Sequence, residues 1–151
     1  MMNLYGFLKF LHVLSVVLWV GGVTALWITT LRLAAAGDHE VMTRLVPVGM
    51  RYGQRIVGPS SGIVLITGIW MAAIGHLFST PWVGIGIIGI ALHFILGATL
   101  IRRNWLQLGQ LVAQPSHDTA ALAAVVKRTT TVSWIYIVIM VIVIAAMVMK
   151  P

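Results

Sequence analysis

Four long apolar runs, separated by polar segments, dominate the pattern of hydrophobic and polar positions. They cover residues 4–31, 59–78, 82–101 and 129–149. Each is long enough to form a helix across the hydrocarbon core of a membrane, which takes about 20 residues. The pattern therefore predicts an all-α protein, an up-and-down bundle of four membrane-spanning helices that forms one domain over residues 1–151.

Helix breakers and caps lie between these runs. Pro59 and Pro81 stand at the starts of the second and third runs, where proline suits the first turn of a helix. Asp38 is predicted to cap a short helix that ends at Pro47. Ser116 is predicted to cap the fourth helix, which would begin before it enters the membrane.

Composition agrees with a membrane protein and excludes several other classes. The chain is 60% hydrophobic and 9% charged, whereas a soluble domain carries about 25% charged residues. Its 151 residues contain no cysteine, so a disulfide, a thiolate zinc site and a cysteine-ligated cluster are excluded. Four spans leave no room for a second domain, and the net charge of +7 is attributed to topology rather than to nucleic-acid binding.

The basic residues gather after the first and third runs. Eight of the ten do so: Arg32, Arg44, Arg51, Arg55, Arg102, Arg103, Lys127 and Arg128; Lys9 and Lys150 are predicted on the opposite side. The short connection at residues 79–81 has none. Because basic loops usually stay in the cytoplasm, both termini are predicted on the outer side of a bacterial inner membrane, with the basic segments at anionic lipid.

Three of the five histidines fall inside apolar runs, and ionisable groups in a membrane are functional candidates because burying them is costly. Below the outer boundary, His12 is predicted at a depth of about 10 Å, His76 at about 6 Å and His93 at about 16 Å. The other two, His39 and His117, lie in polar segments and are interpreted as exposed. The three intramembrane imidazoles could converge on one pocket in the outer half of the bilayer.

The helix faces around these histidines favour one pair. His93 shares its face with Gly86, Gly89 and Gly97, where a flat macrocycle could rest, although small residues at this spacing also serve close helix packing. His12 shares its face with Lys9, Ser15 and Trp19. We therefore predict His12 and His93 as a ligand pair, with His76 as the alternative partner; the competing interpretation is that each histidine only hydrogen-bonds a neighbouring helix.

Two imidazoles without a thiolate suit haem b, because filling both axial positions of the iron favours one-electron transfer over oxygen activation. The predicted function is electron transfer with a quinone or a redox protein, with Lys9 near a haem propionate and Trp19 stacked on the cofactor. Copper is the alternative metal, since Met140, Met147 and Met149 supply thioethers. A noncatalytic subunit of a larger complex or a homo-oligomer is a further alternative. The spans contain no carboxylate, and the chain has no P-loop and no nucleophile elbow.

Short motifs also resemble a known group. Residues 11–15 (LHVLS), 19–22 (WVGG) and 67–70 (TGIW) are similar to those of small bacterial membrane proteins that include the HemJ-type protoporphyrinogen oxidases and the CopD membrane domain. The resemblance implies a four-helix membrane fold, with His12 at the position of a histidine associated with haem b. Those oxidases carry a lysine shortly after the tryptophan that opens their third helix, where this chain has Gly86. The resemblance therefore favours a haem-binding relative, with porphyrinogen oxidation and copper handling as alternatives.

Overall fold

The computed structural model describes residues 4–114 and 118–150, and these residues form helices and short connections without a strand. The α-helices are α1 (Leu4–Ala36), α2 (His39–Tyr52), α3 (Gly58–Ile74), α4 (Pro81–Leu96), α5 (Arg102–Val112) and α6 (Thr119–Met149). Two π-helical turns, η1 (Gly53–Val57) and η2 (Gly97–Ile101), join α2 to α3 and α4 to α5.

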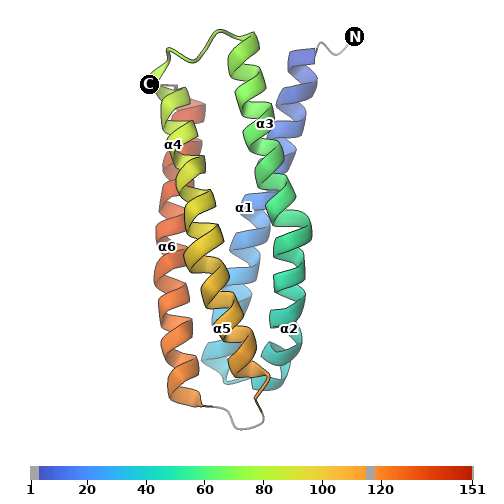
Figure 1. Ribbon diagram of the computed structural model, residues 1–151, viewed down its shortest axis with the longest axis vertical. Coiled ribbons are helices and arrows are strands. Elements are labelled where there is room, and N and C mark those ends of the chain that lie inside the picture. The colour runs from blue at the N-terminus through green and yellow to red at the C-terminus, as the bar shows by residue number, and fades with distance from the viewer. Residues whose placement is uncertain (1–3, 115–117, 151) are drawn as a thin grey trace.

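These elements make four long antiparallel helices, which confirms the predicted all-α bundle (Figure 1). Four stretches are long and apolar enough to cross a membrane: Leu4–Ala36, Glu40–Ile74, Pro81–Val112 and Thr119–Met149. The start of α1 and the end of α6 lie at the same end of the bundle (Figure 1).

The helices extend well beyond the apolar runs. They contain 31 to 35 residues, which corresponds to about 47–53 Å, whereas the hydrocarbon core is only about 30 Å thick. The additional turns, of which the sequence predicted only a short helix ending at Pro47 and the start of the fourth helix, pack on one another at the end away from the termini. We call this end the base and define it by its buried core: Met42, Val46, Leu108, Val112 and Leu122.

The sequence predicted the start of helix α2 correctly but not its end. Asp38 does cap α2, because its Oδ1 accepts the Val41 N–H at 3.1 Å. Pro47, however, lies inside α2 instead of ending it. Burial of the neighbouring Val46, which is 0% exposed, offsets the backbone hydrogen bond that a helical proline loses.

The cap of α6 also differs from the prediction. Asp118 is the N-cap residue, and its Oδ1 accepts the Ala121 N–H at 2.9 Å. The predicted cap, Ser116, lies outside the described residues. A carboxylate suits this position because the first amides of a helix carry a partial positive charge.

His76 lies in the connection between α3 and α4, not in a span. Helix α3 ends at Ile74, and two backbone hydrogen bonds, from His76 N–H to Ala73 O and from Leu77 N–H to Ala72 O, close a Schellman motif. His76 takes the left-handed position of that motif, with φ of 53°, where glycine is usual. Its side chain is exposed, so His76 does not belong with His12 and His93, which lie within α1 and α4.

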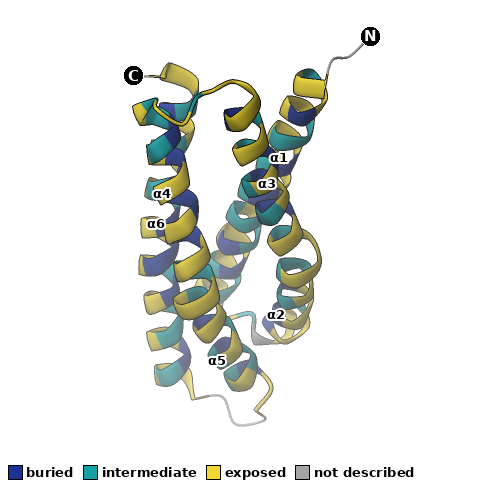
Figure 2. Ribbon diagram, turned by 45° about the horizontal axis from the view of Figure 1, so that its top comes forward, coloured by how far each residue is buried: buried dark blue, intermediate teal, exposed yellow. Residues whose placement is uncertain are grey.

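The bundle consists of two helical hairpins. Helix α1 packs mainly on α3, and α4 packs mainly on α6, whereas α3 and α4 make far fewer contacts with each other. Exposed residues, yellow on the ribbon, recur along the length of both hairpins (Figure 2). Among them are large apolar residues such as Ile88 and Ile95, at 63% and 60% exposure, as expected for a surface that contacts lipid.

The two long helices in the middle of the chain, α2–η1–α3 and α4–η2–α5, each contain a π turn near their centre. The Gly58 N–H donates to Gly53 O in η1, and the Arg102 N–H donates to Gly97 O in η2; both bonds span five residues. Pro59, which follows η1, has no N–H for a regular helical bond, so a wider turn is accommodated there. Turns of this kind are frequent at functional sites.

Candidate functional site

A cavity of about 360 Å³ lies between the two hairpins. It is lined from α1, both π turns and the adjoining parts of α2 to α6; the lining includes Trp19, Trp27, Gln54, His93, Arg102 and Tyr136. This volume lies within the range of pockets that bind small molecules and cofactors, and its mainly apolar wall with a few polar groups is typical of such pockets.

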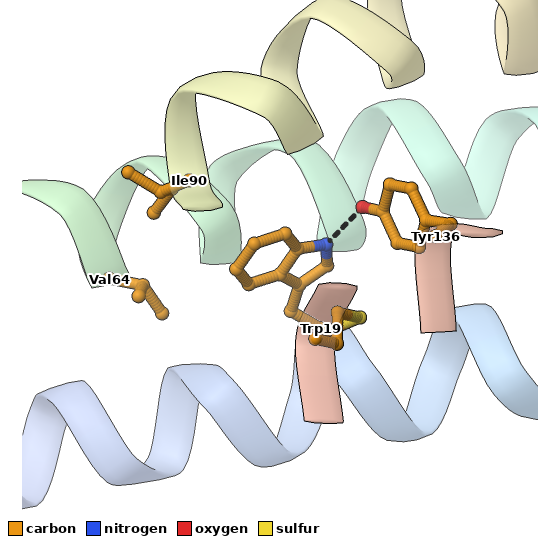
Figure 3. Packing of buried hydrophobic residues seen from close by; sticks show 5 residues of the cluster. Trp19, Val64, Ile90 and Tyr136 are labelled. Atoms are coloured by element: carbon orange, nitrogen blue, oxygen red, sulfur yellow. Dashed lines mark hydrogen bonds between the residues drawn. The ribbon is translucent and has the colours of Figure 1, made fainter. Parts of the chain in front are cut away.

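The best-defined part of the wall is a cluster of three rings from three helices. His93 is 3% exposed, and its ring lies 5.2 Å from that of Trp19 and 4.2 Å from that of Tyr136, with edge-to-face geometry in both pairs. The Trp19 indole N–H donates to the Tyr136 hydroxyl at 2.9 Å (Figure 3). These contacts fix the His93 ring, because edge-to-face packing and a buried hydrogen bond both restrict side-chain rotation.

The two nitrogens of His93 both face backbone carbonyls. Nδ1 lies 2.8 Å from Gly89 O, and Nε2 lies 3.2 Å from Tyr136 O. A neutral imidazole has one N–H, and a carbonyl can only accept, so only one of these contacts can be a hydrogen bond. The shorter one fits Nδ1–H donating to Gly89 O, which leaves the Nε2 lone pair in the cavity wall without a donor.

His12 lies in a different environment. The Thr67 hydroxyl donates to Ile63 O at 2.6 Å, so its oxygen accepts from His12 Nδ1, which lies 3.0 Å away. The Gly68 position lies against the edge of the same imidazole ring. His12 therefore joins α1 to α3 and does not line the cavity that His93 borders, so the structure does not bring the predicted ligand pair together.

The three glycines predicted on the His93 face, two in α4 and one in η2, divide between two roles. A Cβ at Gly86 would come within 1.9 Å of Met147 Cε, and one at Gly89 would come within 2.1 Å of Val143 Cγ2. Both positions are therefore closed by α6, in agreement with the helix-packing interpretation, and leave no space for a macrocycle on that face. Gly97 alone of the three predicted glycines lines the cavity.

Replacing Gly89 by alanine is expected to destabilise the protein by about 1–3 kcal/mol, because Val143 is stiff at its Cβ and cannot move away cheaply. Gly84→Ala on the same helix is the matched control, since an added Cβ there meets nothing within 4 Å. Alanine should be neutral or stabilising at that position. Thermal unfolding of both variants in detergent measures the difference, and equal midpoints would contradict the proposed packing.

The remaining predicted site residues lie outside the cavity lining. Lys9 is exposed near the start of α1, and Ser15 is buried on the same helix. The methionines proposed as copper ligands lie in different environments. Met140 belongs to the core around Trp19, whereas Met149 is 78% exposed. Within the described ranges, no group of three histidine or acidic side chains could hold a metal ion.

Three cavity residues were absent from the predicted site. Neither Tyr136 nor Trp27 was among the predicted site residues, and Arg102 was attributed to topology. Trp27 is 8% exposed and its indole N–H has no partner within the described part of the chain. Helical spacing gave a usable signal, because Trp19, Val23 and Trp27 recur every four residues on one face.

The fold and the cavity define a multi-pass integral membrane protein whose two hairpins enclose a mainly apolar pocket. A family model described as "Predicted integral membrane protein (DUF2269)" matches residues 6–151. The chain belongs to this family. Comparisons with curated proteins and with solved structures found no match.

Proposed function

We propose that this protein binds haem b in the central cavity, with His93 Nε2 as an axial ligand, and transfers electrons. The observation that supports this best is the state of His93: it is buried in the cavity wall, and Nδ1 is held by Gly89 O at 2.8 Å. Histidines that ligate metals usually donate their other N–H to a carbonyl in this way, which orients the ring and makes the ligating nitrogen more basic.

The residues of the cavity fit such a group. Its wall is largely apolar, and Trp19 and Tyr136 border His93 with aromatic surface. His93 Nε2 lies 3.2 Å from Tyr136 O, so binding a metal ion at Nε2 requires the imidazole and this backbone oxygen to move apart, which would also relieve an unfavourable contact between two acceptors. His12 is not part of this site, so the proposal needs one histidine rather than the predicted pair.

Bound haem would supply one-electron redox chemistry, exchanged with a membrane quinone or a redox protein. The protein's own residues would orient and shield the group: Gly89 O sets the direction of His93, and the Trp19–Tyr136 bond holds two cavity walls together. We further propose the bacterial inner membrane as the location, with the base on the cytoplasmic side, because eight of the ten basic residues lie toward the base and only Lys9 and Lys150 lie at the other end.

The direct test is the absorption spectrum of protein purified from cells supplied with haem, in oxidised and reduced forms. We expect a Soret band that elutes with the protein and shifts on reduction. Detergent micelles with the same amount of haem but no protein are the control. A purified, folded protein that shows no Soret band, even after haem is added, would overturn the proposal.

The same preparation distinguishes the alternative functions. Copper handling would give copper in metal analysis without a Soret band. A noncatalytic subunit would copurify with other chains and bind no cofactor. A relationship to HemJ-type or CopD proteins stays a prediction from short motifs, and porphyrinogen oxidation would require restored growth of cells that lack their own oxidase.

A further inference from the structure

The end of the cavity nearer the base contains a buried unpaired donor and an exposed cation, which together suit a negatively charged ligand. Trp27 lines the cavity, is 8% exposed, and its Nε1–H has no partner among the residues described. A buried donor that is left unpaired loses its hydration without compensation, which destabilises the fold. Such a donor in a cavity wall indicates an acceptor that a ligand supplies.

Arg102 contributes the second group. It is the one charged residue among the described residues that line the cavity, and it is exposed. Its position at the end of η2 is stabilised by the bond from its N–H to Gly97 O. A guanidinium at the rim of an apolar cavity favours carboxylate or phosphate, which it can bind with two parallel hydrogen bonds.

The two groups lie at similar levels along the bundle. Trp27 is eight residues beyond Trp19 on α1, and Arg102 is nine residues beyond His93 on the helix formed by α4, η2 and α5. Trp19 contacts His93, and both helices start at the same end. At the helical rise per residue, each group therefore lies about 13 Å from the His93 level toward the base. By the same rise, Lys9 lies about 15 Å from Trp19 in the opposite direction.

We propose that this end of the cavity is a carboxylate site that binds the propionates of the haem, with Trp27 Nε1–H donating to a carboxylate oxygen and Arg102 neutralising its charge. This inference rests on the proposed haem binding and adds an orientation to it. The propionates point toward the base, away from Lys9, whose predicted propionate contact is thereby replaced.

The test compares haem with its dimethyl ester, in which both carboxylates are blocked while the iron porphyrin is unchanged. Binding of each to apoprotein in detergent is followed by the Soret band. Wild type should bind haem roughly 10- to 100-fold more tightly than the diester, as expected for charge-assisted hydrogen bonds. Arg102→Gln should remove most of this preference, and Trp27→Phe should reduce it.

Arg103→Gln is the matched control, because Arg103 is the next residue, carries the same charge and is exposed without lining the cavity. It should keep the wild-type preference, and so should Lys9→Gln. Arg102→Lys keeps the charge but loses the paired hydrogen bonds, so an intermediate preference is expected.

The outcomes separate the two proposals. If wild type binds haem and the diester equally, or if Arg103→Gln acts like Arg102→Gln, the carboxylate site is wrong and haem binding stands. If wild type binds neither form, both proposals fall. Unfolding midpoints equal to wild type show that a lost preference in Arg102→Gln or Trp27→Phe does not come from misfolding.

Discussion

His93→Ala should abolish the haem absorption of the purified protein. The side chain is the one imidazole among the described residues that line the cavity, and its Nε2 faces the cavity wall without a donor. Alanine removes the iron ligand and leaves the apolar walls unchanged. The Soret absorbance per protein, measured after purification and again after haem is added, gives the result.

His12→Ala is the control that tells the two histidines apart. Its Nδ1 is engaged by Thr67 Oγ1 at 3.0 Å, so the variant should lose a contact between α1 and α3 and keep its haem band. A lower unfolding midpoint with a normal spectrum is expected. The opposite result, a lost band in His12→Ala and a normal one in His93→Ala, would contradict the proposed ligand.

Leu108→Ala is expected to lower the free energy of unfolding by about 2–5 kcal/mol. Leu108 is 0% exposed at the centre of the base, between Met42 and Val46 of α2 and Leu122 of α6. The substitution leaves a cavity where three helices meet, and a core of five buried residues has little capacity to close it. Thermal or denaturant unfolding in detergent measures the loss.

Leu106→Ala, two residues earlier on α5, provides the comparison. Leu106 is 42% exposed, so the same substitution removes little packing there. Its cost should stay below about 1 kcal/mol. Similar losses at both positions would show that the core of the base contributes no more to stability than a partly exposed position on the same helix.

The four-helix bundle could be predicted because hydrocarbon forces long apolar helices on the sequence. The base could not be predicted in the same way. Segments such as 39–52 contain proline, glycine and charges, which do not favour a helix by themselves. These helices are stabilised by apolar residues from distant parts of the chain, and the local sequence pattern does not show which distant residues pack on them.

The candidate site was predicted only in part, because it too depends on contacts between distant segments of the chain. His93 and Trp19, which stand out as polar and aromatic groups in apolar runs, both line the cavity, and their role in holding a cofactor stays a prediction. Their partners depend on which helix faces pack together. Packing of α1 on α3 places His12 against Thr67, and packing of α4 on α6 brings Tyr136 to His93, across 43 residues of sequence. Docking of the two hairpins then brings Trp19 to both rings.

The π turns η1 and η2 change which residues share a face of the helix on either side of them. A turn with five-residue bonds adds one residue to the regular repeat, so the faces before and after η1 or η2 are offset by about 100°. The apolar stripe that contacts lipid and the stripe that packs in the base can therefore point in different directions on one continuous helix. Deleting a single residue from either turn would rotate the base relative to the membrane part without breaking the helix, and would thereby close or widen the cavity between them.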